Sequence, residues 1–288
     1  MSKPQKAEKK QTPLLAIRIC IGLLAFLLYS NTLSHKFTLD DDFFFLKNKA
    51  VAKGVASIGS FFTEGSLEGF SDKQGLQPYR PVTLVSFAIQ KEMTGFKLGP
   101  AHFVNVLLFS FLCILLFNFL LKIFPRSSVW IPAVITSLFL FHPVHTEVVA
   151  SIKSRDELLA ALFGVWSLSI FFGNKLESRS WTRIASSLFL FALAIFSKEG
   201  AVALLAIFPL VSLTLCNEKF KKVIVQLTPF ILVTALFLFM RNNAVGSTLT
   251  EKSADVINNI LYGSNGFAEG FATRMEILWV YLRLLFVP

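Results

Sequence analysis

The stretch that decides the fold is Ala101–Leu121, AHFVNVLLFSFLCILLFNFLL, which contains no Lys, Arg, Asp or Glu. A helix that crosses the hydrocarbon layer of a membrane needs about 20 mostly apolar residues. A soluble domain rarely buries so long a run on every face, because one side of its helices meets water. The sequence therefore predicts that this stretch is a membrane-spanning helix.

Comparable apolar runs occur along the rest of the chain, of which 54% is hydrophobic and which contains 32 Phe among 288 residues. The same length criterion predicts about eight crossings. They are expected at Leu14–Leu33, Ala101–Leu121, Trp130–Ala150, Glu157–Phe172, Trp181–Phe196, Ala201–Cys216, Val223–Met240 and Met275–Pro288. The expected fold is an all-α, polytopic transmembrane bundle over residues 14–288, which is incomplete at its C-terminal end, after a basic tail at 1–13.

The distribution of charge predicts how the bundle lies in the membrane. The formal net charge is +10, and Lys and Arg gather in short segments between alternate crossings. These residues are Lys3, Lys6, Lys9, Lys10, Lys122, Arg126, Lys175, Arg179, Arg183, Lys219, Lys221 and Lys222. Short loops rich in Lys and Arg stay on the cytoplasmic side, so the N-terminus is expected inside. No basic stripe or aromatic readout module is present, which excludes nucleic acid as a partner.

The first apolar run also resembles a signal peptide, but no small-residue cleavage site follows it, and a retained first crossing is favoured. The protein is thus expected to be an integral, multi-pass membrane protein. Its Lys- and Phe-rich composition favours a bacterial inner membrane, and a eukaryotic source would imply the endoplasmic reticulum membrane.

Two long segments are expected on the outer side, at residues 35–100 and at Asn242–Arg274. The first is too long to be a simple connector. Within it, Pro81–Met93, PVTLVSFAIQKEM, carries apolar residues at helical spacing. We expect this stretch to be a helix that lies at the membrane interface.

The first candidate site is the acidic run Asp40, Asp41 and Asp42, which follows the first crossing and precedes three Phe. Adjacent carboxylates in apolar surroundings raise at least one pKa, which suits a general base. The alternative is a solvated loop before a helix, because Asp also favours helix N-caps.

The second candidate is FHPVHTEVVASIKSRDE. The residues of interest in it are His142, His145, Glu147, Arg155, Asp156 and Glu157. Pro143 predicts a kink where the crossing would otherwise continue. Two interpretations stay open: a metal site that takes a further ligand from elsewhere, and an interfacial loop whose polar side chains meet water.

Two shorter patterns add cations to the same predicted side. Lys198 and Glu199 lie between two apolar runs, where they either pair with each other or leave the lysine to bind a phosphate. Tyr79 and Arg80 precede the predicted interfacial helix, and His102 follows it. Arg80 either binds phosphate or snorkels at the interface. Cations and carboxylates that gather on one side would suit a lipid-phosphate substrate.

These patterns, in order, resemble the membrane part of the transmembrane O-mannosyltransferases that target cadherins and of their bacterial relatives. Those proteins are glycosyltransferases of the GT-C class, which use polyprenyl-phosphate sugars. The matching residues are Phe37, Asp40, Asp41 and Asn48; Tyr79, Arg80, Pro81 and Thr83; His102, Asn105 and Leu108; His142, Pro143, His145, Thr146, Glu147 and Val149; Arg155, Glu157, Leu158 and Leu159; and Ser197, Lys198 and Glu199. Three positions depart from the family pattern: the second His after Leu108 is absent, with Phe109 and Ser110 there instead, Ser154 replaces a Gly, and Gly200 arrives one position early.

The resemblance implies a GT-C-like fold and transfer of a sugar, with mannose expected, from a polyprenyl- or dolichyl-phosphate donor to a hydroxyl group. The acceptor would be a protein Ser/Thr or a glycan on the outer or lumenal face, and the reaction would invert the anomeric carbon. The family requires no cofactor and allows a divalent cation, and no metal ligand is assigned. The rival hypothesis is a transporter or flippase for a lipid-linked or anionic solute.

The resemblance also implies roles for individual residues. The catalytic residues would be Asp40, Asp41 and Glu147, with one of the two aspartates as general base. The donor phosphate would be bound by Arg80, His145, Arg155 and Lys198. Supporting positions would be Asp42, Tyr79, His102, His142, Glu157 and Glu199. The expected partners are the lipid-phosphate-sugar donor, the hydroxyl-bearing acceptor and membrane lipid.

Overall fold

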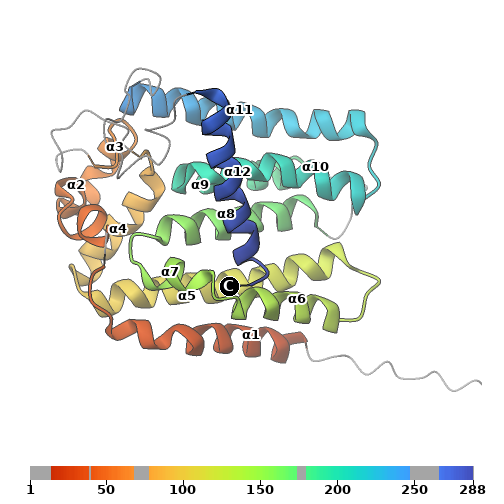
Figure 1. Ribbon diagram of the computed structural model, residues 1–288, viewed down its shortest axis with the longest axis horizontal. Coiled ribbons are helices and arrows are strands. Elements are labelled where there is room, and N and C mark those ends of the chain that lie inside the picture. Colours follow the sequence, from red (N-terminus) through yellow and green to blue (C-terminus); the bar gives the residue numbers. More distant parts are fainter. Residues whose placement is uncertain (1–13, 39, 68–77, 174–179, 247–265, 288) are drawn as a thin grey trace, which may run out of the picture.

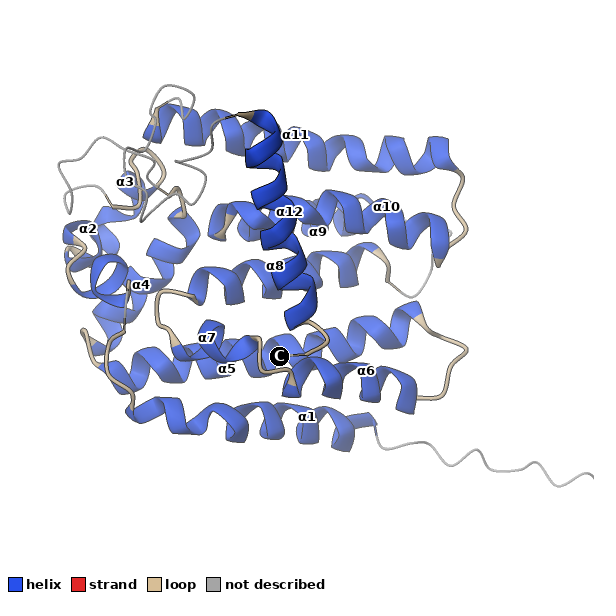
Figure 2. Ribbon diagram, in the orientation of Figure 1, coloured by secondary structure: helices blue, strands red, loops and turns tan. Residues whose placement is uncertain are grey.

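The computed structural model describes residues 14–38, 40–67, 78–173, 180–246 and 266–287. Throughout these ranges the regular structure is helical, with no strand (Figure 2). The predicted all-α class is therefore confirmed. The basic tail 1–13 and residues 247–265 of the second predicted outer loop lie outside the described residues. The division into a tail and one membrane domain stays a prediction.

The main body is a bundle of helices whose axes run nearly parallel (Figure 1). These helices are α1 (Leu14–Tyr29), α5 (Leu98–Ile123), α6 (Trp130–Phe141), α8 (Arg155–Phe171), α9 (Trp181–Ser197), α10 (Leu204–Thr214) and α11 (Phe220–Val245). Among the described residues, Leu14–Ser34, Leu98–Ile123 and Phe220–Val245 are long and apolar enough to cross a membrane. Such spans are typical of a membrane protein, while the predicted number of crossings and their orientation stay predictions.

Short helices and turns gather at one end of the bundle, on the left of Figure 1. They are η1 (Ser30–Ser34), η2 (Asp42–Leu46), α2 (Lys49–Ala52), η3 (Gly54–Ser57), α3 (Ile58–Phe61) and α4 (Pro81–Thr94). Helix α4 coincides with the helix predicted at Pro81–Met93, and it starts at a proline because the first helical N–H has no partner to lose. Its buried Leu84 and Phe87 pack with Phe45 in a small apolar core. A place at the membrane interface stays a prediction for α4.

The third predicted crossing, Trp130–Ala150, is not one continuous helix. Helix α6 ends at Phe141, and the short helix α7 (His145–Ala150) begins after Pro143. Proline has no N–H to donate to the preceding turn, which interrupts the helical ladder. The kink predicted at Pro143 is thus confirmed as a break, and it turns the chain before α8 begins.

Helix α12 (Phe267–Leu284) has a different direction from the rest, and its axis runs across the bundle in Figure 1. It contains most of the last predicted crossing, Met275–Pro288. Just after it, the Leu285 carbonyl lies 3.1 Å from Nε2 of His142. Most side chains of α12 are exposed.

Aromatic rings and small residues hold the neighbouring helices α8 to α11 together. The Phe208 ring centroid lies 4.9 Å from that of Phe171 and 4.3 Å from that of Phe230. The Ser167 and Ser187 hydroxyls lie 2.9 Å apart across α8 and α9. The hydrophobic effect between helices is weak in lipid, so such packing and small polar contacts hold the helices together.

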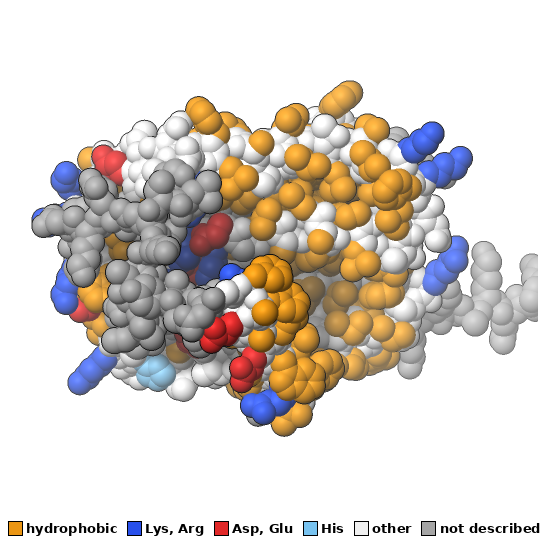
Figure 3. Space-filling view, turned by 45° about the horizontal axis from the view of Figure 1, so that its top comes forward, with side chains coloured by type: hydrophobic (Ala, Val, Ile, Leu, Met, Phe, Trp, Pro, Cys, Tyr) orange, Lys and Arg blue, Asp and Glu red, His pale blue; other side chains and the backbone are white. Residues whose placement is uncertain are grey.

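The connections α5–α6 and α10–α11 lie at the end of the bundle opposite α4 (Figure 1). Lys and Arg side chains are seen at that end in Figure 3 as well. These connections and the short helices thus lie at opposite ends of the bundle (Figure 1), while Lys and Arg side chains occur at both ends (Figure 3). Contacts join the segment before α4 to the start of α8 and to η4, and join the acidic run to the turn before α8.

Candidate functional site

The centre of the charged cluster is the carboxylate of Asp156, in the first turn of α8. Its side chain is 1% exposed and is in contact with three cations. Arg80 donates a hydrogen bond from Nη1 to Oδ2, and Lys153 Nζ lies 3.8 Å from the same oxygen. Lys198 Nζ lies 3.9 Å from Oδ1. One buried acid thus holds together cations from three separate segments, which precede α4, α8 and η4 (Glu199–Ala203).

Two further acids close the outer edge of this cluster. Arg80 binds Glu199 with two nitrogens, Nη2 to Oε1 at 3.2 Å and Nε to Oε2 at 3.4 Å. Lys198 pairs with Glu157. The side chains of Glu199 and Glu157 are 49% and 43% exposed, in contrast to buried Asp156. Figure 3 shows acidic and basic side chains together in a recess beside a broad hydrophobic surface.

The pairing between Arg80 and Glu199 fixes both charges. Partial burial alone would raise the pKa of Glu199. The hydrogen bonds and charge of Arg80 lower this pKa by more, so that it lies below its ordinary value. Burial alone would lower the pKa of Arg80, and the charges of Asp156 and Glu199 outweigh this and raise it. Both groups are therefore ionised at neutral pH.

The three aspartates that follow the first crossing lie in three different environments. Asp41 is 0% exposed. Its Oδ1 accepts hydrogen bonds from Ser151 Oγ at 2.9 Å and from the Lys153 N–H at 2.8 Å, and its Oδ2 accepts from the Thr38 N–H at 3.1 Å. Asp40 is exposed, and Asp42 lies 2.7 Å from Lys47 Nζ. Of the three residues, Asp40 is the most exposed.

Arg155 lies inside the protein and is 0% exposed. Its Nε donates to Asn105 Oδ1 at 2.9 Å and its Nη2 donates to the Ala101 carbonyl at 3.0 Å. The guanidinium lies over the Phe87 ring, 4.7 Å from its centroid. Asn105 in turn donates to the Ser151 carbonyl at 2.8 Å. Arg155 therefore fixes the start of α8 against α5, in the same network that holds Asp41 through Ser151.

His102 is also 0% exposed, and neither ring nitrogen has a hydrogen-bond partner within the described part of the chain. Tyr79 is 1% exposed, and its hydroxyl donates to the Phe62 carbonyl at 2.8 Å. Burial raises the pKa of Tyr79 to about 12, so it stays a neutral donor. Both side chains are packed within the fold around the cluster.

The histidines of the second predicted motif do not join the Arg80 cluster through any contact among the described residues. The His145 ring packs against Phe139 and Phe109, with centroids 4.3 Å and 5.5 Å away. His142 meets the carbonyl that follows α12. Glu147 is exposed. The structure thus brings together Arg80, Glu157, Lys198 and Glu199. It places His142, His145 and Glu147 outside this group.

Sequence reasoning gave no role to four residues of this network, Asp156, Lys153, Ser151 and Asn105, although Asp156 belongs to the second candidate and Asn105 to the matching residues. The signal that could have indicated two of them is the run KSRDE, whose charges are dense for a membrane boundary. In the part of the chain that is described, no three His, Cys, Asp or Glu side chains gather in a way that could hold a metal ion. Metal dependence therefore gains no support from these residues.

The fold and site together define an α-helical membrane bundle with a charged cluster at one end. Comparison with known proteins shows several relatives. The chain is 28% identical to human protein O-mannosyl-transferase TMTC3 over 183 residues, which is 62% of this chain and 20% of that protein. It is 27% identical to mouse protein O-mannosyl-transferase TMTC4 over 213 residues, which is 66% of this chain and 28% of that protein.

A third relative is Xenopus laevis protein O-mannosyl-transferase tmtc2, 32% identical over 192 residues, or 64% of this chain and 22% of that protein. The predicted resemblance is therefore confirmed: the chain is related to the protein O-mannosyl-transferases. The matched stretch spans between 20% and 28% of the length of these three relatives. No family model and no solved structure matches the chain.

Proposed function

We propose that this protein is a glycosyltransferase that moves mannose from a polyprenyl- or dolichyl-phosphate donor to a hydroxyl group of a protein or glycan. The reaction would take place at the α4 end of the bundle, on the face opposite the basic connections. The observation that carries the proposal is the cluster of Arg80, Lys198 and Asp156 at the end that also presents Asp40. The relationship to protein O-mannosyl-transferases supports the choice of sugar and reaction.

The cations suit the charge that develops on the leaving group. When the bond between the anomeric carbon and the donor phosphate breaks, its electron pair stays on the phosphate oxygen. Fixed cations at that oxygen lower the barrier, because they are already oriented before the charge appears. Arg80 and Lys198 fit this role, since both meet partly exposed carboxylates, Glu199 and Glu157, which a phosphate can replace. Buried Asp156 would keep both cations in place during the exchange.

Asp40 is the proposed general base. The acceptor oxygen attacks the anomeric carbon from the side opposite the phosphate, its proton passes to the Asp40 carboxylate, and the configuration inverts. Asp41 is a positioning residue in this proposal, because its Oδ1 holds the loop to the turn before α8 and its Oδ2 holds Thr38 within the loop. Arg155 positions the same turn from inside the protein.

The test uses the full chain in nanodiscs with a radiolabelled polyprenyl-phosphate mannose and a membrane fraction as the source of acceptors. Wild type is compared with Asp40→Asn and with Glu64→Gln, which removes an exposed acid from the same outer segment. We expect all three to bind the donor. Transfer should fall by about 10²–10⁴-fold in Asp40→Asn only, which is the usual contribution of a general base.

Two results would contradict the proposal. Full transfer by Asp40→Asn would remove Asp40 as the base. Absence of donor binding in every variant would instead favour the transporter or flippase hypothesis. Charge removal at Arg80 gives an independent test: Arg80→Gln should weaken donor binding, while Glu64→Gln should not.

A further inference from the structure

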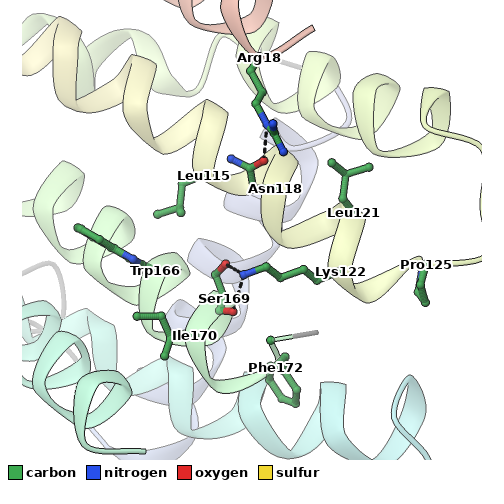
Figure 4. Close-up of a pocket in the computed structure, with 11 residues that line it drawn as sticks. Arg18, Leu115, Asn118, Leu121, Lys122, Pro125, Trp166, Ser169, Ile170 and Phe172 are labelled. Atoms are coloured by element: carbon green, nitrogen blue, oxygen red, sulfur yellow. Dashed lines mark hydrogen bonds between the residues drawn. The ribbon is translucent and has the colours of Figure 1, made fainter. Parts of the chain in front are cut away.

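A second polar site lies at the opposite end of the bundle, at a cavity of about 810 Å³ between α1, α5 and α8. Figure 4 shows Arg18 reaching from α1 toward Asn118 of α5, and Lys122 reaching from α5 toward Ser169 of α8. The size lies within the range of about 300–1,000 Å³ that is usual for small-molecule sites. Nothing in the proposed transfer reaction uses this cavity.

Both cations at the cavity are held by neutral groups. Arg18 Nε donates to Asn118 Oδ1 at 2.8 Å. Lys122 Nζ donates to the carbonyl and to the hydroxyl of Ser169, both at 2.9 Å. Among the described residues, neither Arg18 nor Lys122 forms an ion pair with a carboxylate. Their positive charges therefore remain available to an anion.

A positive charge such as that of Arg18 costs free energy in an apolar membrane-spanning segment unless it has a partner or a function. It lies within Leu14–Ser34, one of the segments long and apolar enough to span a membrane. A long cationic side chain near the end of such a helix normally extends toward water. Arg18 instead turns toward Asn118, one helical turn before Lys122 on the same face of α5. Asn118 and Lys122 are four residues apart, so their Cβ atoms lie about 5–6 Å apart on α5. Arg18, held at Asn118, and Lys122 thus line the same cavity from adjacent turns of this face.

The remaining lining of the cavity is mainly apolar. Leu115, Leu121, Trp166 and Ile170 contribute to it, and Trp166 is 45% exposed. A free inorganic anion gains nothing from such a surface, whereas the glycerol and upper acyl chain of a lipid do. Indole rings are also favoured at the level of lipid headgroups.

We propose that this cavity binds the headgroup of an anionic phospholipid, with its phosphate at Arg18 and Lys122 and its acyl chains along Leu115 and Trp166. The basic connections at this end of the bundle attract the same lipids. The inference is independent of the proposed transfer reaction. It makes the bound lipid part of the contact between α1, α5 and α8.

Native mass spectrometry tests the proposal on the full chain released from micelles that contain equal amounts of phosphatidylglycerol and phosphatidylcholine. Wild type should retain phosphatidylglycerol in preference. The preference should fall about fivefold in Arg18→Gln or in Lys122→Gln, because each cation near a lipid surface contributes about that factor. Arg126→Gln is the matched control, since it removes a charge from the α5–α6 connection without lining the cavity.

Arg18→Lys keeps the charge and should keep most of the preference, which separates charge from folding. Equal retention of both lipids by wild type would overturn the proposal. An equal loss in Arg126→Gln would overturn it as well, since general surface charge would then explain the preference. Displacement of the lipid by millimolar inorganic phosphate would replace the lipid assignment with a free-anion site.

Discussion

Replacing Asp41 by Asn should destabilise the protein, although the two side chains have almost the same shape. Both carboxylate oxygens of Asp41 accept hydrogen bonds, one from Ser151 and Lys153 and the other from Thr38. Asparagine supplies one acceptor oxygen and one NH₂ group. Whichever way the amide turns, its NH₂ group faces donors that had an acceptor in the wild type.

The lower-cost orientation can be worked out from the structure. The contacts to Thr38 are the longer ones, 3.1 Å from N–H and 3.4 Å from Oγ1, and Thr38 is exposed, so its donors can turn to water. The amide should therefore direct its NH₂ group toward Thr38 and keep its oxygen at Ser151 and Lys153. Loss of a buried, charge-assisted acceptor of this kind costs about 1–3 kcal/mol of the free energy of unfolding.

Thermal unfolding in detergent, followed by intrinsic fluorescence, measures this loss. At about 2–4 °C for each kcal/mol in a chain of roughly this size, Tm should fall by about 2–12 °C. Asp40→Asn is the matched control, because it makes the same chemical change at the exposed neighbour and should alter the free energy of unfolding by less than about 0.5 kcal/mol. A wild-type Tm for Asp41→Asn, with a lowered Tm for Asp40→Asn, would refute the assignment of the two carboxylates.

Three further outcomes are expected. Asp156→Asn leaves Arg80, Lys153 and Lys198 without their buried counter-charge, so the free energy of unfolding should fall by about 3–5 kcal/mol, as measured by denaturant unfolding. Because the pKa of Glu199 is lowered in the folded state, its stabilising effect should be present above its ordinary pKa and be lost as pH falls through the lowered value; Glu199→Gln should flatten the acid limb of a plot of Tm against pH. Tyr79→Phe loses one hydrogen bond to the Phe62 carbonyl, which should cost about 0.5–1.5 kcal/mol in the same unfolding assay while transfer at permissive temperature stays at the wild-type rate.

Much of the fold follows from the lengths of the apolar runs. Ala101–Leu121 predicts α5, which the structure extends to Leu98–Ile123, and Pro143 predicts the break after α6. The direction of α12 could not be predicted in this way. An apolar stretch specifies that a helix forms, but its tilt depends on which neighbours pack against it. Met275–Pro288 carries no pattern that indicates a helix across the bundle.

The candidate site is harder to predict, because successive residues of one helical turn point in different directions. Arg155, Asp156 and Glu157 are adjacent, and each is turned by about 100° from the one before. Arg155 consequently enters the interior at Asn105, Asp156 meets Arg80 and two lysines, and Glu157 stays at the partly exposed edge. The packing of α8 against α5 and α9 fixes this rotation, and the order of charges in the sequence does not encode it. The same reasoning separates Asp40 from Asp41, so the number of acids in a run cannot identify which one reaches a substrate.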